Sequence, residues 1–212
     1  MKIQPFTLGE VSTNTYVVYE DGGKAILIDA PDKIERAIGF IKENGLELTH
    51  ILLTHAHFDH VMGLGKLKKE FPEAEIFVEE NDDFFLRNKG EGNIELLSHG
   101  FPFMLGAFKP YLDEIPGSYS FYKEKILNFT VIRTPGHTRG SVCLYDEEEH
   151  VLFSGDTIFK SSYGRTDFPG GSHTDLMASI RILLGTVDDE TLVLPGHGEY
   201  THVKDEKAFY GL

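Results

Sequence analysis

The chain has 212 residues, a length that suits one domain with a sizeable hydrophobic core. Hydrophobic residues make up 41% and charged residues 25% of the sequence, as is typical of soluble globular proteins. The net charge of -14 argues against binding to nucleic acids or anionic membranes, and we expect neither as a partner.

The N-terminal half is predicted to contain strands and two helices. "NTYVVYE" and "KAILIDA" are strand patterns joined by a turn at Asp21–Gly23, which indicates a hairpin. Apolar residues recur at helical spacing within 31–45, so we expect an amphipathic helix that stops at Gly45. "HILLTH" predicts a short buried strand. "DHVMGLGKLKKEF" (59–71) predicts a second helix, which ends before Pro72.

The C-terminal half repeats this plan. "FTVIRT" predicts a strand, and "SVCLYDEEEHVLFSG" predicts a hairpin around acidic turn residues. "SHTDLMASIRILLG" predicts a helix with a capping box formed by Ser172 and Asp175, and "TLVLPG" predicts the last strand. The segment 81–125 is rich in Phe, Tyr, Gly and Pro. We expect it to form a partial lid over a pocket, or else a second part of the core.

Ligand-type residues gather at the ends of four predicted strands. The stretch "THAHFDH" (54–60) follows a strand with the pattern H-x-H-x-D-H. His137 in "TPGHT", Asp156 in "SGDT" and His197 in "PGHG" each follow another strand. Strand ends aim such loops at one place, and zinc, iron and manganese accept imidazole and carboxylate ligands. The sequence therefore predicts a metal site.

With these motifs and the strand "ILIDA" (26–30), the whole chain resembles the metallo-β-lactamase-fold hydrolases. The resemblance implies an α/β protein with one domain over 1–212. Its fold would be a four-layer αββα sandwich of two mixed β-sheets with the site along one edge. It also implies that His55, His57 and His137 hold one metal ion, that Asp59, His60 and His197 hold a second, and that Asp156 bridges the two.

The number of ligands agrees with this implication. Seven are too many for one four-coordinate zinc ion but suit two ions that each keep an open position. Two divalent ions, zinc above all but also iron or manganese, can activate a bridging hydroxide at neutral pH, which Asp59 would help to position. The other five histidines are expected in surface or packing roles: His50, His99, His150, His173 and His202.

The substrate is indicated by "YGRTDFPGGS" (163–172), which resembles the glyoxalase II-like branch, the hydroxyacylglutathione hydrolases. The resemblance implies hydrolysis of a thioester such as S-lactoylglutathione. Arg165 would contact a carboxylate of the thiol moiety, or would only pair with Asp167 and lock the loop. Asp29 would support the metal ligands, or serve as a turn carboxylate. Only a short tail follows "LPGHG", so we expect this chain to lack the C-terminal glutathione-binding domain of that branch.

Rival functions remain open. A mono-iron glutathione-persulfide dioxygenase would use His55, His137 and Asp156. A non-catalytic metal-binding module would keep the ligands without the chemistry. RNA-processing nucleases are disfavoured by the charge. β-Lactam hydrolysis is disfavoured because "MKIQPFTLGE" lacks a signal-peptide core, and with a single cysteine (Cys143) we expect a cytoplasmic protein.

Overall fold

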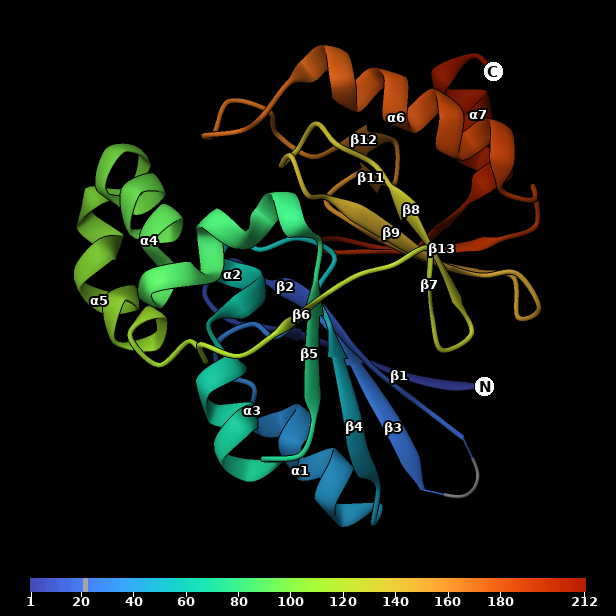
Figure 1. Ribbon diagram of the computed structural model, residues 1–212. Helices are drawn as coiled ribbons and strands as arrows, with labels where there is room; N and C mark the ends of the chain where they lie inside the picture. Colours follow the sequence, from blue (N-terminus) through green and yellow to red (C-terminus); the bar gives the residue numbers. More distant parts are fainter. Residues whose placement is uncertain (21–22) are drawn as a thin grey trace.

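The computed structural model describes residues 1–20 and 23–212, and two β-sheets face each other at its centre (Figure 1). The first sheet has, in spatial order, the strands β1 (Lys2–Leu8), β2 (Thr13–Tyr19), β3 (Lys24–Ile28), β4 (Glu47–Leu52), β5 (Glu75–Val78) and β6 (Ser120–Phe121). The second has the order β14 (Thr201–His202), β13 (Leu192–Pro195), β10 (Val151–Gly155), β9 (Val142–Asp146), β8 (Phe129–Arg133) and β7 (Lys125–Ile126). A small hairpin pairs β11 (Ile158–Phe159) with β12 (Ser162–Tyr163).

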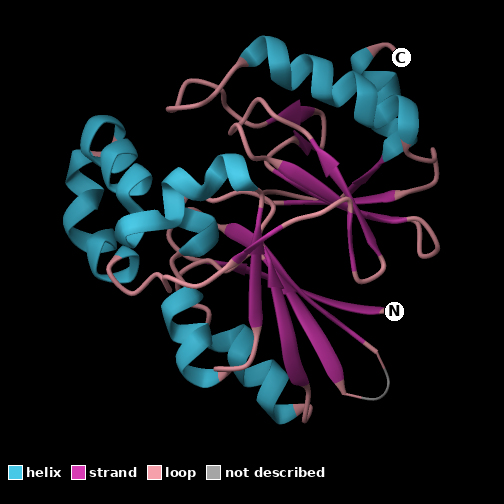
Figure 2. Ribbon diagram, in the orientation of Figure 1, coloured by secondary structure: helices cyan, strands magenta, loops and turns pink. Residues whose placement is uncertain are grey.

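Helices cover the outer faces of both sheets (Figure 2). On the side of the first sheet lie α1 (Glu35–Glu43), α2 (Phe58–Val61), α3 (Leu64–Glu70), the short 3₁₀ turn η1 (Glu80–Asp82), α4 (Asp83–Gly100) and α5 (Pro102–Leu112). On the side of the second lie α6 (His173–Thr186) and α7 (Val203–Tyr210). Both sheets contain parallel and antiparallel pairs. The predicted four-layer α/β sandwich of mixed sheets is therefore confirmed.

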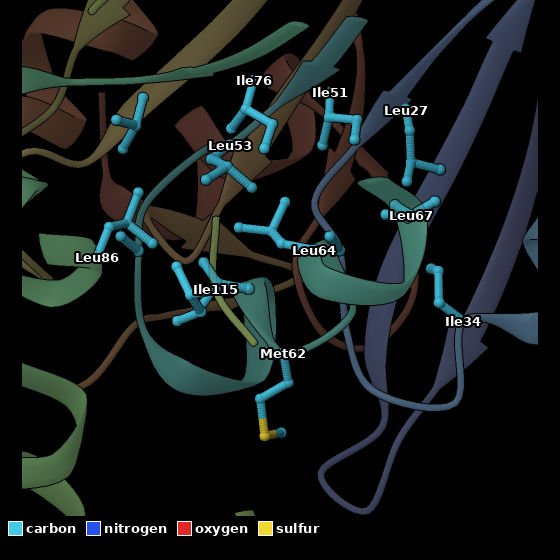
Figure 3. Packing of buried hydrophobic residues seen from close by; sticks show 14 of the residues in the cluster. Leu27, Ile34, Ile51, Leu53, Met62, Leu64, Leu67, Ile76, Leu86 and Ile115 are labelled. Atoms are coloured by element: carbon cyan, nitrogen blue, oxygen red, sulfur yellow. The ribbon is translucent and has the colours of Figure 1, made fainter. Parts of the chain in front are cut away.

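Alternating side chains of the strands build these layers. Val17 and Leu27 point to the core shared with the first set of helices, whereas Val18 and Ile26 point to the core between the sheets. Successive strand residues face opposite sides of a sheet, so a strand buried on both faces is apolar throughout. Figure 3 shows the outer core, in which strand residues such as Ile51 pack against Leu64 and Leu67 of α3.

The predicted helix over 59–71 is wrong as one element, because it is broken into α2 and α3. The N–H of Gly63 donates to the carbonyl of Ala30 at 2.8 Å, and the carbonyl of His60 accepts from the N–H of Ala30 at 2.8 Å. These long-range bonds replace helical ones. A side chain at position 63 would also clash, since a Cβ there would lie 2.4 Å from the Pro31 carbonyl oxygen.

Most other predicted elements are present. The 31–45 helix is α1, the "SVCLYDEEEHVLFSG" hairpin is β9 and β10, and the Ser172 side chain caps α6 by accepting from the Asp175 N–H. The predicted hairpin is formed by β2 and β3, but residues 21 and 22 of its turn lie outside the described residues. Cys143 is buried in β9, as its apolar surroundings predict.

The segment 81–125 is mainly the helical pair α4 and α5, which packs on the first set of helices. Phe85, Leu97 and Phe108 are buried in the same core as α1 and α3. The backbone of α4 is kinked at Arg87–Gly90, where three successive residues have positive φ. None of the described helices is long and apolar enough to cross a membrane.

Candidate metal centre

The stretch after β4 brings several candidate ligands to one edge of the sandwich. His55 and His57 lie in the loop, and Asp59 and His60 lie in the single turn of α2. Asp29 fixes the start of the loop, because it accepts hydrogen bonds from the Thr54 N–H and hydroxyl at 2.8 Å each. All four candidate ligands are buried.

The second sheet contributes one residue from each of three strand ends. His137 follows β8, Asp156 follows β10, and His197 follows β13. The last two approach each other closely, because a Cβ at Gly196 would lie 2.3 Å from Asp156 Oδ1. Any larger residue at position 196 would push against Asp156 and His60, so glycine lets the two strand ends meet at the cluster without displacing either side chain.

The seven side chains converge into overlapping groups whose ligand atoms lie within 4.8 Å of one another. The groups are His55 with His57 and His137, His55 with His60 and Asp156, and Asp59 with His60 and His197. His57 Nδ1 lies 2.9 Å from His137 Nε2, and His197 Nε2 lies 3.2 Å from Asp59 Oδ2. The structure thus brings together all seven of the ligand candidates named from the sequence.

Hydrogen bonds to the histidine rings determine which nitrogen is presented to the cluster. His137 Nδ1 lies 2.7 Å from the Arg165 carbonyl oxygen, which can only accept, so this nitrogen carries the proton. His60 Nδ1 lies 2.8 Å from Asp29 Oδ2 and is a donor for the same reason. In both rings the nitrogen that faces the cluster is therefore Nε2, the atom through which each ring would bind a metal ion.

Several buried atoms of the cluster have no hydrogen-bond partner among the described residues. They are Nε2 of His55, His57 and His60, and Oδ1 of Asp156. Leaving a buried polar atom unpaired costs about 1–3 kcal/mol, so four such atoms in one place need a common partner. A divalent cation satisfies imidazole nitrogen and carboxylate oxygen together, and the residues present fit such an ion.

The histidines of the cluster differ in their pKa values. Burial, reinforced by neighbouring histidines, lowers the pKa of His55 and His57 well below the usual value, so both are neutral ligands at pH 7. Burial opposes the ionisation of Asp156, but the charge of His60 lowers its pKa to about 2. Burial likewise opposes the protonation of His60, but Asp59, Asp29 and Asp156 together raise its pKa well above the usual value. The carboxylate side of the cluster therefore attracts positive charge.

A cavity of about 350 Å³ opens above the cluster. Its walls are mainly apolar and are formed by Val11, Phe58, Phe101, Phe159 and Phe168. Arg165 also lines it, with its guanidinium 3.8 Å from the centre of the Phe168 ring and two 2.6 Å hydrogen bonds to Asp167. Phe101 comes from the junction of α4 and α5, so the 81–125 segment provides one wall.

The sequence placed Phe101 in a possible lid and Phe168 in the motif 163–172, but it singled out neither as a wall residue. It gave no sign of Val11, Phe58 and Phe159 as walls, nor of the two buried polar residues behind the cluster, Asp82 and Asn93. His50, His99, His150, His173 and His202 belong to none of the groups within the described chain.

The chain matches the model of the metallo-beta-lactamase superfamily over residues 8–197. It is 32% identical to hydroxyacylglutathione hydrolase GloC of Haemophilus influenzae, over 98% of this chain and 95% of that one. Two solved structures are similar over nearly the full length. The BLEG-1 B3 metallo-beta-lactamase has a TM-score of 0.83 and 33% identity, with 98% of this chain and 97% of that chain covered. TTHA1623 in a di-iron-bound form has a TM-score of 0.82 and 33% identity, with 96% of each covered.

Proposed function

Because the chain belongs to the metallo-beta-lactamase superfamily, we propose that it is a metal-dependent hydrolase of thioesters, acting on S-lactoylglutathione or a similar hydroxyacyl thioester. The observation that carries the metal chemistry is the convergence of seven ligand-type side chains, four of which have a buried atom without a hydrogen-bond partner. The choice of a thioester is supported by the full-length similarity to a hydroxyacylglutathione hydrolase.

In this proposal His55, His57 and His137 would hold one ion, and Asp59, His60 and His197 would hold a second. Asp156 would serve both, because its oxygens lie 3.5 Å from Nε2 of His60 and of His137. Two divalent ions, such as zinc, iron or manganese, would supply a water ionised near neutral pH and a Lewis acid for the substrate carbonyl. Asp59 is held by the Thr13 hydroxyl, which donates to its Oδ2 at 2.9 Å. We assign to Asp59 the task of orienting the attacking water.

The apolar walls of the cavity suit thioester hydrolysis, in which the leaving group needs no general acid. A thiolate leaves as a weak base with a pKa of about 8.5, so no strong general acid is required beside it. The apolar rings of Phe58, Phe101 and Phe159 exclude bulk water from the carbonyl and strengthen electrostatic interactions in the cavity.

We further propose that Arg165 contacts a carboxylate of the thiol moiety. Arg165→Ala should then raise KM for S-lactoylglutathione more than KM for a neutral thioester. Asp167→Ala is the matched control, because it removes the partner of the arginine and keeps the positive charge. Equal changes for both substrates in Arg165→Ala, together with lower thermal stability, would instead assign the pair to locking the loop.

The activity is tested with purified protein loaded with zinc or manganese and offered S-lactoylglutathione. We expect thioester hydrolysis that is lost in His57→Asn and no oxygen uptake with glutathione persulfide. Iron-dependent oxygen uptake, with thioesters left intact, would show that the protein is a dioxygenase instead.

β-Lactam hydrolysis is a second candidate, favoured by the similarity to a B3 metallo-beta-lactamase over nearly the whole chain. A chromogenic cephalosporin offered to the same protein separates the two activities. A kcat/KM for the cephalosporin that exceeds the value for every thioester would reverse the order of the candidates.

A further inference from the structure

Asp82 is a fully buried carboxylate at the end of η1 that connects two loops of the metal centre. Its Oδ2 accepts hydrogen bonds from the Ala56 N–H and the Thr138 hydroxyl, both at 2.9 Å. Its Oδ1 accepts from the Gly140 N–H at 2.8 Å. The donors come from positions 26 to 58 residues away along the chain.

Ala56 lies between His55 and His57, and two residues of the segment 82–93 bind its N–H and its carbonyl oxygen. Asp82 binds its N–H, and Asn93 Nδ2 donates to its carbonyl oxygen at 2.9 Å. Asn93 is itself buried and also donates to the Phe85 carbonyl. With both of its backbone polar groups engaged, Ala56 is fixed, and neither of the peptide units that link it to His55 and His57 can rotate without breaking a buried hydrogen bond.

The other loop, 137–141, is held just as closely. Thr138 follows His137 directly, and its hydroxyl lies 2.9 Å from Asp82 Oδ2 and 2.7 Å from the Ser141 hydroxyl. A Cβ at Gly140 would lie 2.6 Å from the Asp82 backbone nitrogen, so this loop rests directly on Asp82.

We propose that Asp82 is a positioning residue that fixes the separation of His57 and His137 and thereby sets the affinity of the three-histidine group for its ion, with Asn93 assisting. His57 comes from the loop after β4 of the first sheet, and His137 comes from the loop after β8 of the second. Asp82 is where those two loops are joined by one side chain. The proposal requires that the cluster binds metal, and it does not depend on the substrate.

The test is a zinc titration of metal-free Asp82→Asn. Asparagine has the same shape but offers one oxygen in place of two, so at least one of the three donors loses its acceptor. We expect one of two binding steps to weaken by about tenfold or more, with the other step unchanged. Glu206→Gln is the matched control, because Glu206 is also buried and accepts from the Ser161 N–H and the Thr201 hydroxyl on α7's side of the molecule.

Double variants identify the affected group. In a His57→Asn background the three-histidine group is already lost, so adding Asp82→Asn should change zinc affinity no further. In a His197→Asn background the full cost of Asp82→Asn should remain. The opposite pattern, with the cost present only when His57 is replaced, would overturn the assignment.

A purely structural role makes a different prediction. In that case Asp82→Asn and Glu206→Gln would lower the melting temperature of the metal-free protein alike, and zinc affinity would be unchanged in both. This result would overturn the proposal. If Asp82→Asn does not fold, Thr138→Val removes one donor only, and a severalfold loss in the same binding step is expected. Unchanged affinity in that variant would count against the proposal.

Discussion

Two buried carboxylates support the metal centre, and they do so through different partners. Asp29 contacts a candidate ligand directly, since its Oδ2 lies 2.8 Å from His60 Nδ1. Asp82 instead accepts from the backbone of Ala56 and Gly140 and from the Thr138 hydroxyl. Asp29 therefore orients one ring and also holds Thr54 just before His55, whereas Asp82 joins two loops. A site shared by two sheets needs both kinds of support, and mutation should separate their effects.

The largest effect is expected where the two groups meet, at Asp156. Its oxygens lie 3.5 Å from the Nε2 atoms of both His60 and His137. Asp156→Ala should weaken metal binding at both positions by more than about 100-fold. In contrast, Asp29 and Asp82 variants should each weaken only one binding step. Metal content after dialysis measures this. Full metal content and activity in this variant would contradict the assignment of Asp156 to both metal positions.

The raised pKa of Asp82 should make the free energy of unfolding depend on pH. Burial raises its pKa from 3.8 to about 6, so between these values the folded protein binds a proton that the unfolded chain does not. The contribution to the free energy of unfolding is fully present below pH 4 and is lost as the pH rises through 6, by about 3 kcal/mol. Denaturant unfolding of metal-free protein and Asp82→Asn at several pH values measures it. A constant difference between the two proteins from pH 4 to 7 would contradict the expectation.

Asp29→Asn should affect the other side of the centre. The Asp29 backbone has a φ of 60°, a conformation that asparagine tolerates well, so the fold is retained. The ring of His60 loses its charged acceptor, and we expect metal binding at the Asp59–His60–His197 group to weaken about 10- to 100-fold. Zinc titrations of Asp29→Asn and Asp82→Asn, run side by side, show which binding step each variant weakens. If both variants weaken the same step, the two carboxylates do not support different metal positions.

Gly140→Ala is expected to reproduce Asp82→Asn more weakly. The added Cβ would lie 2.7 Å from Asp82 Cγ, so the carboxylate must shift while keeping its charge. We expect a loss of a few fold in zinc affinity in the same step, smaller than the loss in Asp82→Asn. Gly185→Ala is the control, because it lies in α6 with open space at its Cβ. Equal behaviour of the two alanine variants would deny close contact between Asp82 and the loop.

The ligand cluster and Asp82 differ in how far the sequence predicts them. The stretch 54–60 is contiguous, and His137, Asp156 and His197 each follow a recognisable strand, so the cluster was predictable from local patterns. Asp29 ends a buried strand within a matched motif. Asp82 stands in "VEENDDFF", which looks like an exposed acidic turn, and its partners are backbone groups far away in the chain. Such long-range bonds also broke the predicted helix at Gly63.

The 81–125 segment shows the same limit. Its aromatic residues fit either a lid or a core, because composition does not say which side of a helix faces inward. In the structure Phe85 and Phe108 enter the core, while Phe101 lines the cavity. The positive φ values at Asn88 and Lys89 that kink α4 carry no sequence signal beyond the following Gly90.

We propose that seven residues from both sheets form a centre for two metal ions. The most direct test is a zinc titration of protein stripped of metal, with the bound zinc counted per chain. We expect saturation at two ions per chain, falling to one in His197→Asn, with the three-histidine group still occupied. Saturation at one ion in the unaltered protein, or no binding, would contradict it.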